Sequence, residues 1–179
     1  MMKFILVAAV SILSTLASGL TLQDLTRRAT VIRPELAMVV KEDFPNTPFP
    51  TNIAEVSRTN GAHTVETLFC FVVPPCTGWC TISFSNAISA TASGTLQLFS
   101  MFKCPDGDTW NTKPPLDAHV ATFLVPAGGT GPAVVFEDLR LTFQCPWTTT
   151  KYGFELKPVN DYDSVTWDIT KGGLVINCT

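Results

Sequence analysis

The chain has 179 residues, a formal net charge of −3 and hydrophobic residues at 46% of its positions. So large an apolar fraction excludes a disordered polar chain, because it is enough to bury a core. The net negative charge makes nucleic acid and anionic membranes poor partners. The 13 Pro and 11 Gly are scattered between apolar stretches, which is typical of turns within a folded domain.

The N-terminus has the pattern of a cleaved signal helix. Lys3 supplies the positive charge, and an apolar stretch runs from Phe4 to Leu16. This stretch is too short to span a bilayer comfortably, and the small residues after it allow cleavage after Gly19. Residues 1–19 are therefore interpreted as a signal peptide. Residues 20–28 fit a pro-segment that ends in a dibasic cleavage site at Arg28.

Residues 29–179 are then expected to form one secreted domain. Without the segment before residue 29, the chain keeps nine basic and fourteen acidic residues, a net charge of −5. No later stretch reaches the ~18 apolar residues of a membrane span. We therefore expect an extracellular or cell-wall protein that is not attached to a membrane after cleavage and that is a monomer.

All cysteines lie in this domain, and an even number in an exported chain predicts disulfides. Six cysteines allow 15 pairings, and the sequence does not choose among them. Cys76 and Cys80 also have a spacing that zinc accepts, but a matching second pair is missing. The disulfide interpretation is preferred, and no metal site or cofactor is predicted. The cysteines are Cys70, Cys76, Cys80, Cys104, Cys145 and Cys178.

Alternation of apolar and polar residues recurs in short segments and predicts β-strands with one buried face. Turn signals separate the segments, and no helical period lies between them. This pattern favours an all-β fold, a two-sheet antiparallel sandwich of jelly-roll-like topology, with a closed barrel as the alternative. The expected strands lie within residues 36–40, 65–73, 81–84, 95–98, 120–125, 134–143, 152–159, 165–169 and 174–176.

The apolar members of these strands are the predicted core, because they alternate with polar residues. They are Phe69, Phe71, Ile82, Phe84, Leu96, Leu98, Phe123, Val125, Leu141, Phe143, Phe154, Leu156, Trp167 and Ile169.

Short segments along the mature chain share their order and spacing with a known family. They include Glu55-Val-Ser-Arg-Thr-Asn-Gly-Ala, Cys80-Thr-Ile-Ser-Phe, Gly94-Thr-Leu-Gln-Leu-Phe and Tyr152-Gly-Phe-Glu-Leu. In this order they resemble a fungal secreted family, that of the ubiquitin three binding protein C-terminal domain. The resemblance implies an extracellular β-sandwich and carries over no catalytic motif. Ubiquitin-related binding is not carried over, because the signal peptide directs this chain outside the cell.

Three tryptophans, Trp79, Trp110 and Trp147, lie beside Gly, Asn, Pro or Thr and outside the alternating segments. Trp110 has Asp108 and Asn111 as neighbours, which are groups that hydrogen-bond sugar hydroxyls around an apolar ring face. The segment Asp108-Thr-Trp-Asn-Thr-Lys-Pro-Pro also resembles carbohydrate-associated β-sandwich modules. These five residues are the candidate ligand site. The competing interpretation is that the indoles cap the ends of the sandwich.

The sequence contains no catalytic signature. The two histidines, His63 and His119, lie beside no nucleophile elbow, and the Asp106 loop is interpreted as an Asx-turn in preference to a calcium site. We therefore expect a non-catalytic binding module for a carbohydrate or an extracellular protein. The alternatives are a secreted effector or structural protein acting through a protein partner, and a hydrolase, which requires two carboxylates meeting in a cleft.

Overall fold

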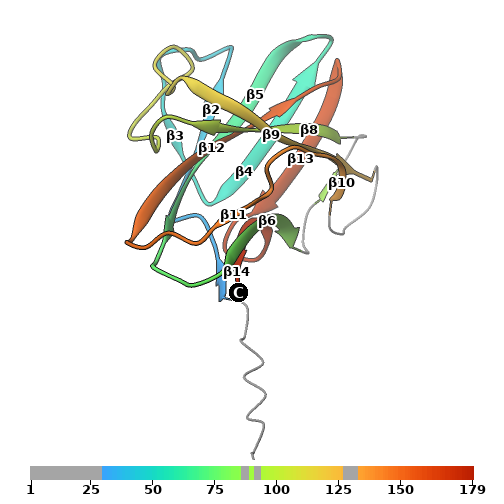
Figure 1. Ribbon diagram of the computed structural model, residues 1–179. Helices are drawn as coiled ribbons and strands as arrows, with labels where there is room; N and C mark the ends of the chain where they lie inside the picture. Colours follow the sequence, from blue (N-terminus) through green and yellow to red (C-terminus); the bar gives the residue numbers. More distant parts are fainter. Residues whose placement is uncertain (1–29, 86–88, 91–93, 127–132) are drawn as a thin grey trace, which may run out of the picture.

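The computed structural model describes residues 30–85, 89–90, 94–126 and 133–179. In this part the chain is all-β, and its strands form two sheets packed together (Figure 1). The predicted two-sheet antiparallel sandwich is confirmed. The expected signal segment and pro-segment, with cleavage after Gly19 and Arg28, lie outside the described residues. None of the described residues belongs to a helix long and apolar enough to cross a membrane.

The small sheet has four strands, and every pairing in it is antiparallel. Its inward residues include Ile82, Phe84, Leu174 and Ile176, all buried. The last strand in the row has only three residues, so this edge of the sheet is short. The strand order is β1 (Thr30–Ile32), β14 (Gly173–Cys178), β6 (Trp79–Ser85) and β11 (Thr142–Gln144).

The large sheet has ten strands and forms the other layer, also with antiparallel pairing throughout. Along its main path the order is β10 (Val134–Asp138), β9 (Leu116–Val125), β8 (Gly94–Met101), β12 (Thr150–Pro158), β5 (Ala62–Val73), β4 (Ile53–Thr59), β13 (Tyr162–Asp168) and β7 (Ser89–Ala90). Beside this path, β2 (Leu36–Lys41) pairs with β5 and with β3 (Phe49–Pro50).

The main core lies between the two sheets and is rich in aromatic rings. Phe84 packs edge-on against Phe123 with ring centroids 4.8 Å apart, and Phe69 stacks on Trp167 at 5.9 Å. Every predicted core residue is buried except Phe143, which is half-buried at the edge of the core. Phe143 therefore remains partly accessible to solvent.

The expected single strand over residues 134–143 is wrong, because the structure divides this segment between the two sheets. β10 pairs with β9 through a bulge near Phe136. The chain then turns, and the amides of Leu139 and Arg140 both donate to the carbonyl of Val120. β11 follows in the small sheet. Leu141 lies in the turn and is buried, so the alternation of apolar and polar residues continues across it. Periodicity alone therefore does not show that the chain passes from the large sheet to the small sheet.

Three disulfides are present, as predicted, and the structure supplies the pairing. Cys70 bonds Cys104, Cys76 bonds Cys145, and Cys80 bonds Cys178. The bridges close loops with sequence separations of 34, 69 and 98 residues. Such bridges constrain the unfolded chain strongly and are typical of extracellular proteins.

Candidate functional site

A cleft of about 390 Å³ opens between the two sheets beside β11. Because β11 has only three residues, the small sheet leaves this end of the large sheet uncovered. One wall comes from β6 and β11, with Ile82 and Phe143. The other comes from β8, β9 and β12, with Val120, Tyr152 and Phe154. The volume lies in the range of small-ligand sites.

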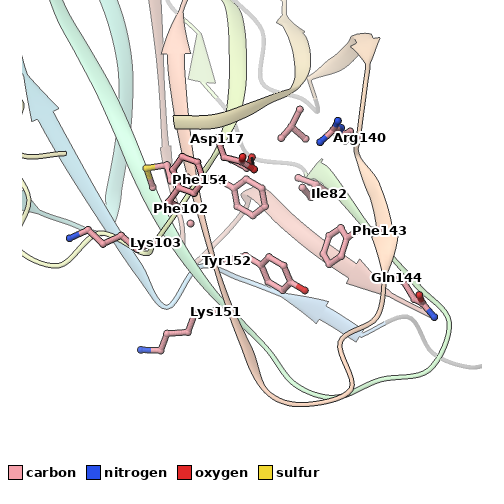
Figure 2. A pocket seen from close by; sticks show the side chains of 14 residues that line it. Ile82, Phe102, Lys103, Asp117, Arg140, Phe143, Gln144, Lys151, Tyr152 and Phe154 are labelled. Carbon is pink, nitrogen blue, oxygen red and sulfur yellow. Dashed lines mark hydrogen bonds between the residues drawn. The ribbon is translucent and has the colours of Figure 1, made fainter. Parts of the chain in front are cut away.

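Aromatic rings form the apolar part of the cleft. Phe143 and Tyr152 face each other from different sheets, with ring centroids 5.1 Å apart and planes inclined by 49°. Figure 2 shows this pair in the middle of the cleft, with Gln144 beyond it. Phe102 follows β8 and is 72% exposed at the rim.

Polar groups lie at both ends of these rings. Asp117 accepts a hydrogen bond of 3.1 Å from the Ser100 hydroxyl, which leaves one of its oxygens available. Arg140 lies near Asp117 at the same end of the cleft (Figure 2), and its guanidinium forms no ion pair within the described ranges. Gln144 provides an amide at the other end. The cleft therefore offers a cation, a carboxylate and an amide around an apolar floor.

Two lysines, Lys103 and Lys151, also line the cleft. Figure 2 shows the ammonium groups of Lys103 and Lys151 directed away from the rings. Lys103 is held close to β12 at Gly153, where an added Cβ would lie 2.4 Å from the Lys103 carbonyl oxygen. The Cys70–Cys104 disulfide fixes the next residue. The Phe102 rim is thus anchored by a close backbone approach and by a disulfide.

Burial raises the pKa of the Tyr152 phenol above its usual value. The phenol therefore keeps its proton at neutral and moderately alkaline pH, and its hydroxyl both donates and accepts hydrogen bonds. It adds a neutral polar group to the aromatic pair.

The sequence-predicted group around Trp110 lies elsewhere, on the outer face of the large sheet. Trp110 packs against a second small core formed by Met38, Val40, Leu68 and Met101. The Lys113 ammonium lies over its ring at 4.3 Å from the centroid, so the indole face is already occupied.

The two polar neighbours of Trp110 are also engaged. Asp108 is buried and accepts a 2.7 Å hydrogen bond from the amide of Asp106. The Asn111 amide donates to the side chain of Asn46 at 2.9 Å. The bond runs from the Asp106 amide back to the Asp108 carboxylate, which is the reverse of the Asx-turn that the sequence predicted at Asp106. The three residues fold the loop and form no open platform.

The other two candidate tryptophans lie beside the cleft. Trp79 begins β6, where it is the register partner of Gln144, and it is 59% exposed. Trp147 is 81% exposed in the loop that joins β11 to β12, and hence joins the two walls of the cleft. Trp147 is three positions after Gln144, so its Cα lies within about 11 Å of the Gln144 Cα. Sequence reasoning found these tryptophans but missed the cleft.

A pair of buried carboxyl groups lies beneath the Trp110 loop, outside the cleft. Glu66 and Glu155 come from the neighbouring strands β5 and β12, and they share a hydrogen bond. Lys113 contacts both of them, at 2.8 Å for Glu155, and Lys157 lies 3.3 Å from Glu66. Glu66 and Glu155 are 1% and 0% exposed. A substrate therefore has no access to these carboxyls in this conformation.

The environment separates the pKa values of the two carboxyls. Burial raises the pKa of Glu155 to about 7, and the hydrogen bond and charge of Glu66 act in the same direction. Burial opposes ionisation of Glu66 as well, but the hydrogen bond with Glu155 and the charges of Lys113 and Lys157 hold its pKa below the usual value. The pair therefore holds one proton over the mildly acidic range.

The two histidines have structural contacts outside the cleft. His63 is exposed and lies 2.9 Å from Asp43, while His119 stacks on Phe99 with ring centroids 5.0 Å apart. Among the residues that line the cleft, Asp117 is the one carboxylate, and none is a histidine. Asp163 on β13 is also engaged in folding, because its carboxylate accepts hydrogen bonds from the backbone amides of Thr95, Val159 and Asn160.

The comparisons with known proteins include a weak structural likeness to a solved structure. No family model and no curated protein matches the chain. A crystal structure of the CBM22-1 and GH10 modules of a Clostridium thermocellum endo-1,4-β-D-xylanase, complexed with xylohexaose, matches with a TM-score of 0.37 and 10% identity. The match covers 84% of this chain and 28% of that chain, so this chain spans less than a third of that protein's length.

Proposed function

We propose that the protein is a secreted, non-catalytic β-sandwich module that binds a carbohydrate in the cleft between its two sheets. The observation that carries this proposal is the combination of half-buried and exposed aromatic rings with hydrogen-bonding groups at both ends of one open cleft. Secretion is supported by the three disulfides. The resemblance to a fungal secreted family supports an extracellular or cell-wall location.

The chemistry of the cleft suits a sugar better than a wholly apolar ligand. A pyranose ring has apolar C–H faces and a polar edge of hydroxyls. Phe143 and Tyr152 offer surfaces for the C–H faces, while Asp117, Arg140 and Gln144 offer acceptors and donors for the hydroxyls. The cleft is open to solvent, so a sugar can enter without unfolding an element.

The test is binding of the purified chain to a panel of soluble polysaccharides, by affinity electrophoresis and then by calorimetry. We expect Tyr152→Ala to weaken binding of the retained glycan at least tenfold, because it removes one of the two facing rings. Arg140→Ala should weaken it by a similar factor. No binding by the wild type to any glycan of the panel would contradict the proposal.

The chain provides matched controls for both variants. Its second tyrosine, Tyr162, is 60% exposed on β13 and does not line the cleft, and Arg33 is an exposed arginine outside the cleft. Tyr162→Ala and Arg33→Ala should leave the affinity within about twofold of wild type. Equal losses in the cleft and control variants would place binding elsewhere.

Trp147 gives a further prediction about ligand length. A long oligosaccharide that leaves the cleft past Gln144 meets the β11–β12 loop, whereas a disaccharide confined between Tyr152 and Asp117 does not. Trp147→Ala should therefore weaken binding of long oligosaccharides several-fold and leave disaccharide binding unchanged. Calorimetry with a length series of the retained glycan checks this, and an equal loss for all lengths would exclude Trp147 as an extension of the cleft.

A second candidate function, binding of a protein partner, is favoured by the edge strand β10. All five of its residues are exposed, including Val134, Val135 and Phe136, and Leu139 follows at 50% exposure. Exposed apolar strand edges pair readily with other chains. Phe136→Glu should abolish self-association, or capture of a partner from culture fluid, if this strand is the binding surface. Glycan affinity should not change in this variant.

A further inference from the structure

Four of the six cysteine sulfur atoms gather at the end of the core beside the small sheet. The Cys80 sulfur lies 3.3 Å from that of Cys145 and 3.6 Å from that of Cys76, although its disulfide partner is Cys178. All four sulfur atoms lie within 4.8 Å of one another. Two disulfides are therefore in contact, and we call these atoms the four-sulfur cluster.

The dimensions of this cluster match those of a tetrathiolate metal site. A tetrahedral zinc ion with Zn–S distances of about 2.3 Å places its sulfur ligands about 3.8 Å apart. The contacts of 3.3 and 3.6 Å between the two disulfides are close to this separation. We propose that, when these two disulfides are reduced, Cys76, Cys80, Cys145 and Cys178 bind one Zn²⁺ or a similar thiophilic divalent ion.

The backbone positions the four cysteines independently of the disulfides. Cys80 and Cys178 are register partners on the adjacent strands β6 and β14. The Cys145 amide donates to the carbonyl of Gly78 at 3.0 Å, and the Cys76 amide donates to that of Pro146 at 3.3 Å. These hydrogen bonds remain possible after reduction, so the thiols stay close together without covalent bonds.

The cluster also has a route for reductant and metal. A pocket of about 190 Å³ is lined by Cys76 and Cys178. Cys76 is half-buried, whereas the other three cysteines are buried. Attack by an external thiolate is therefore expected at the Cys76–Cys145 disulfide first, because thiol exchange requires access to a sulfur atom.

The reaction balances with a dithiol as reductant. Two dithiol molecules supply four electrons and four protons, which open the two disulfides to four thiols, and each reductant becomes an internal disulfide. Binding of Zn²⁺ then forms four Zn–S bonds and releases the four thiol protons. The site therefore exists only in the reduced chain, and reoxidation to the two disulfides releases the metal.

The third disulfide provides a selective test. Cys70 and Cys104 lie away from the cluster, so the double variant Cys70→Ser/Cys104→Ser contains only the four cluster cysteines. The purified variant is reduced with a phosphine under argon and titrated with Co²⁺ alone. We expect one Co²⁺ per chain with the visible absorption of a tetrahedral thiolate complex, bleached by one equivalent of Zn²⁺. Far-ultraviolet circular dichroism should retain the strand signal.

Two comparisons complete the test. Cys76→Ser/Cys145→Ser, which removes two cluster ligands, should bind Co²⁺ at least about 100-fold more weakly. The unreduced chain should bind none. Octahedral or absent Co²⁺ binding by the reduced Cys70→Ser/Cys104→Ser variant would overturn the proposal. Tetrahedral binding with loss of the strand signal would overturn it too, because the metal would then be held by an unfolded chain.

Discussion

Lys113→Met should lower the free energy of unfolding at pH 7 by about 3 kcal/mol, because it leaves two buried carboxyls without their nearest cation. Lys113 contacts both Glu66 and Glu155, and its side chain is only 21% exposed. Methionine retains much of the stem over Trp110 but removes the charge, so the loss reports the electrostatic contact. Urea unfolding followed by tryptophan fluorescence measures the change.

The matched control is Lys171→Met. Lys171 pairs with Asp168 at 3.3 Å, but its side chain is 75% exposed. Exposed pairs contribute little, so this variant should lose less than about 1 kcal/mol. If Lys113→Met also lost less than about 1 kcal/mol, the buried cluster would not depend on its lysine. The same variant removes the ammonium group that lies over the Trp110 ring, and glycan binding gained by it would show that this charged group blocks the sequence-predicted site.

The strand pattern was readable from the sequence because period two survives wherever one face of a strand is buried. β8 is the clear case, where Leu96 and Leu98 are buried and the polar residues between and before them are only partly buried. β4 was missed because its only large apolar residue at the start, Ile53, lies on the exposed side. Its inward residues are the small side chains of Ala54 and Val56, which give a weak signal.

Most of the site depends on contacts between residues distant in sequence. Phe143 and Tyr152 have the period of core residues, and no local signal distinguishes them from Phe154. They become a cleft because the neighbouring β11 is short and ends the small sheet there. Glu66 likewise alternates with buried residues, and this pattern predicts that its side chain is exposed to solvent. It is buried because the loop that carries Lys113 folds over it. The pairing of the cysteines has the same long-range origin.

The stability of the wild type should fall by about 3 kcal/mol between pH 4.5 and pH 7 through the Glu66–Glu155 pair. The pKa of Glu155 is raised from 4.5 in the unfolded chain to about 7 in the folded protein. Across this window the folded state holds a proton that the unfolded state has lost, so each pH unit costs about 1.4 kcal/mol. The contribution is complete below pH 4.5 and lost above pH 7.

Glu155→Gln should remove this decline, because its amide donates to Glu66 and accepts from Lys113 without titrating. The difference in unfolding free energy between wild type and variant is measured in urea at intervals from pH 4.5 to 7.5. Both proteins contain the same two histidines, so the difference reports the Glu66–Glu155 pair alone. Glu55→Gln is the control, since Glu55 forms a partly exposed pair with Lys41 at 3.1 Å and should leave the decline in place. A wild type whose stability is constant over this range, or a decline that persists in Glu155→Gln, would mean that the two carboxyls do not share a proton. The outer face of the large sheet would then be held by two full ion pairs, and the loss expected for Lys113→Met would increase with pH.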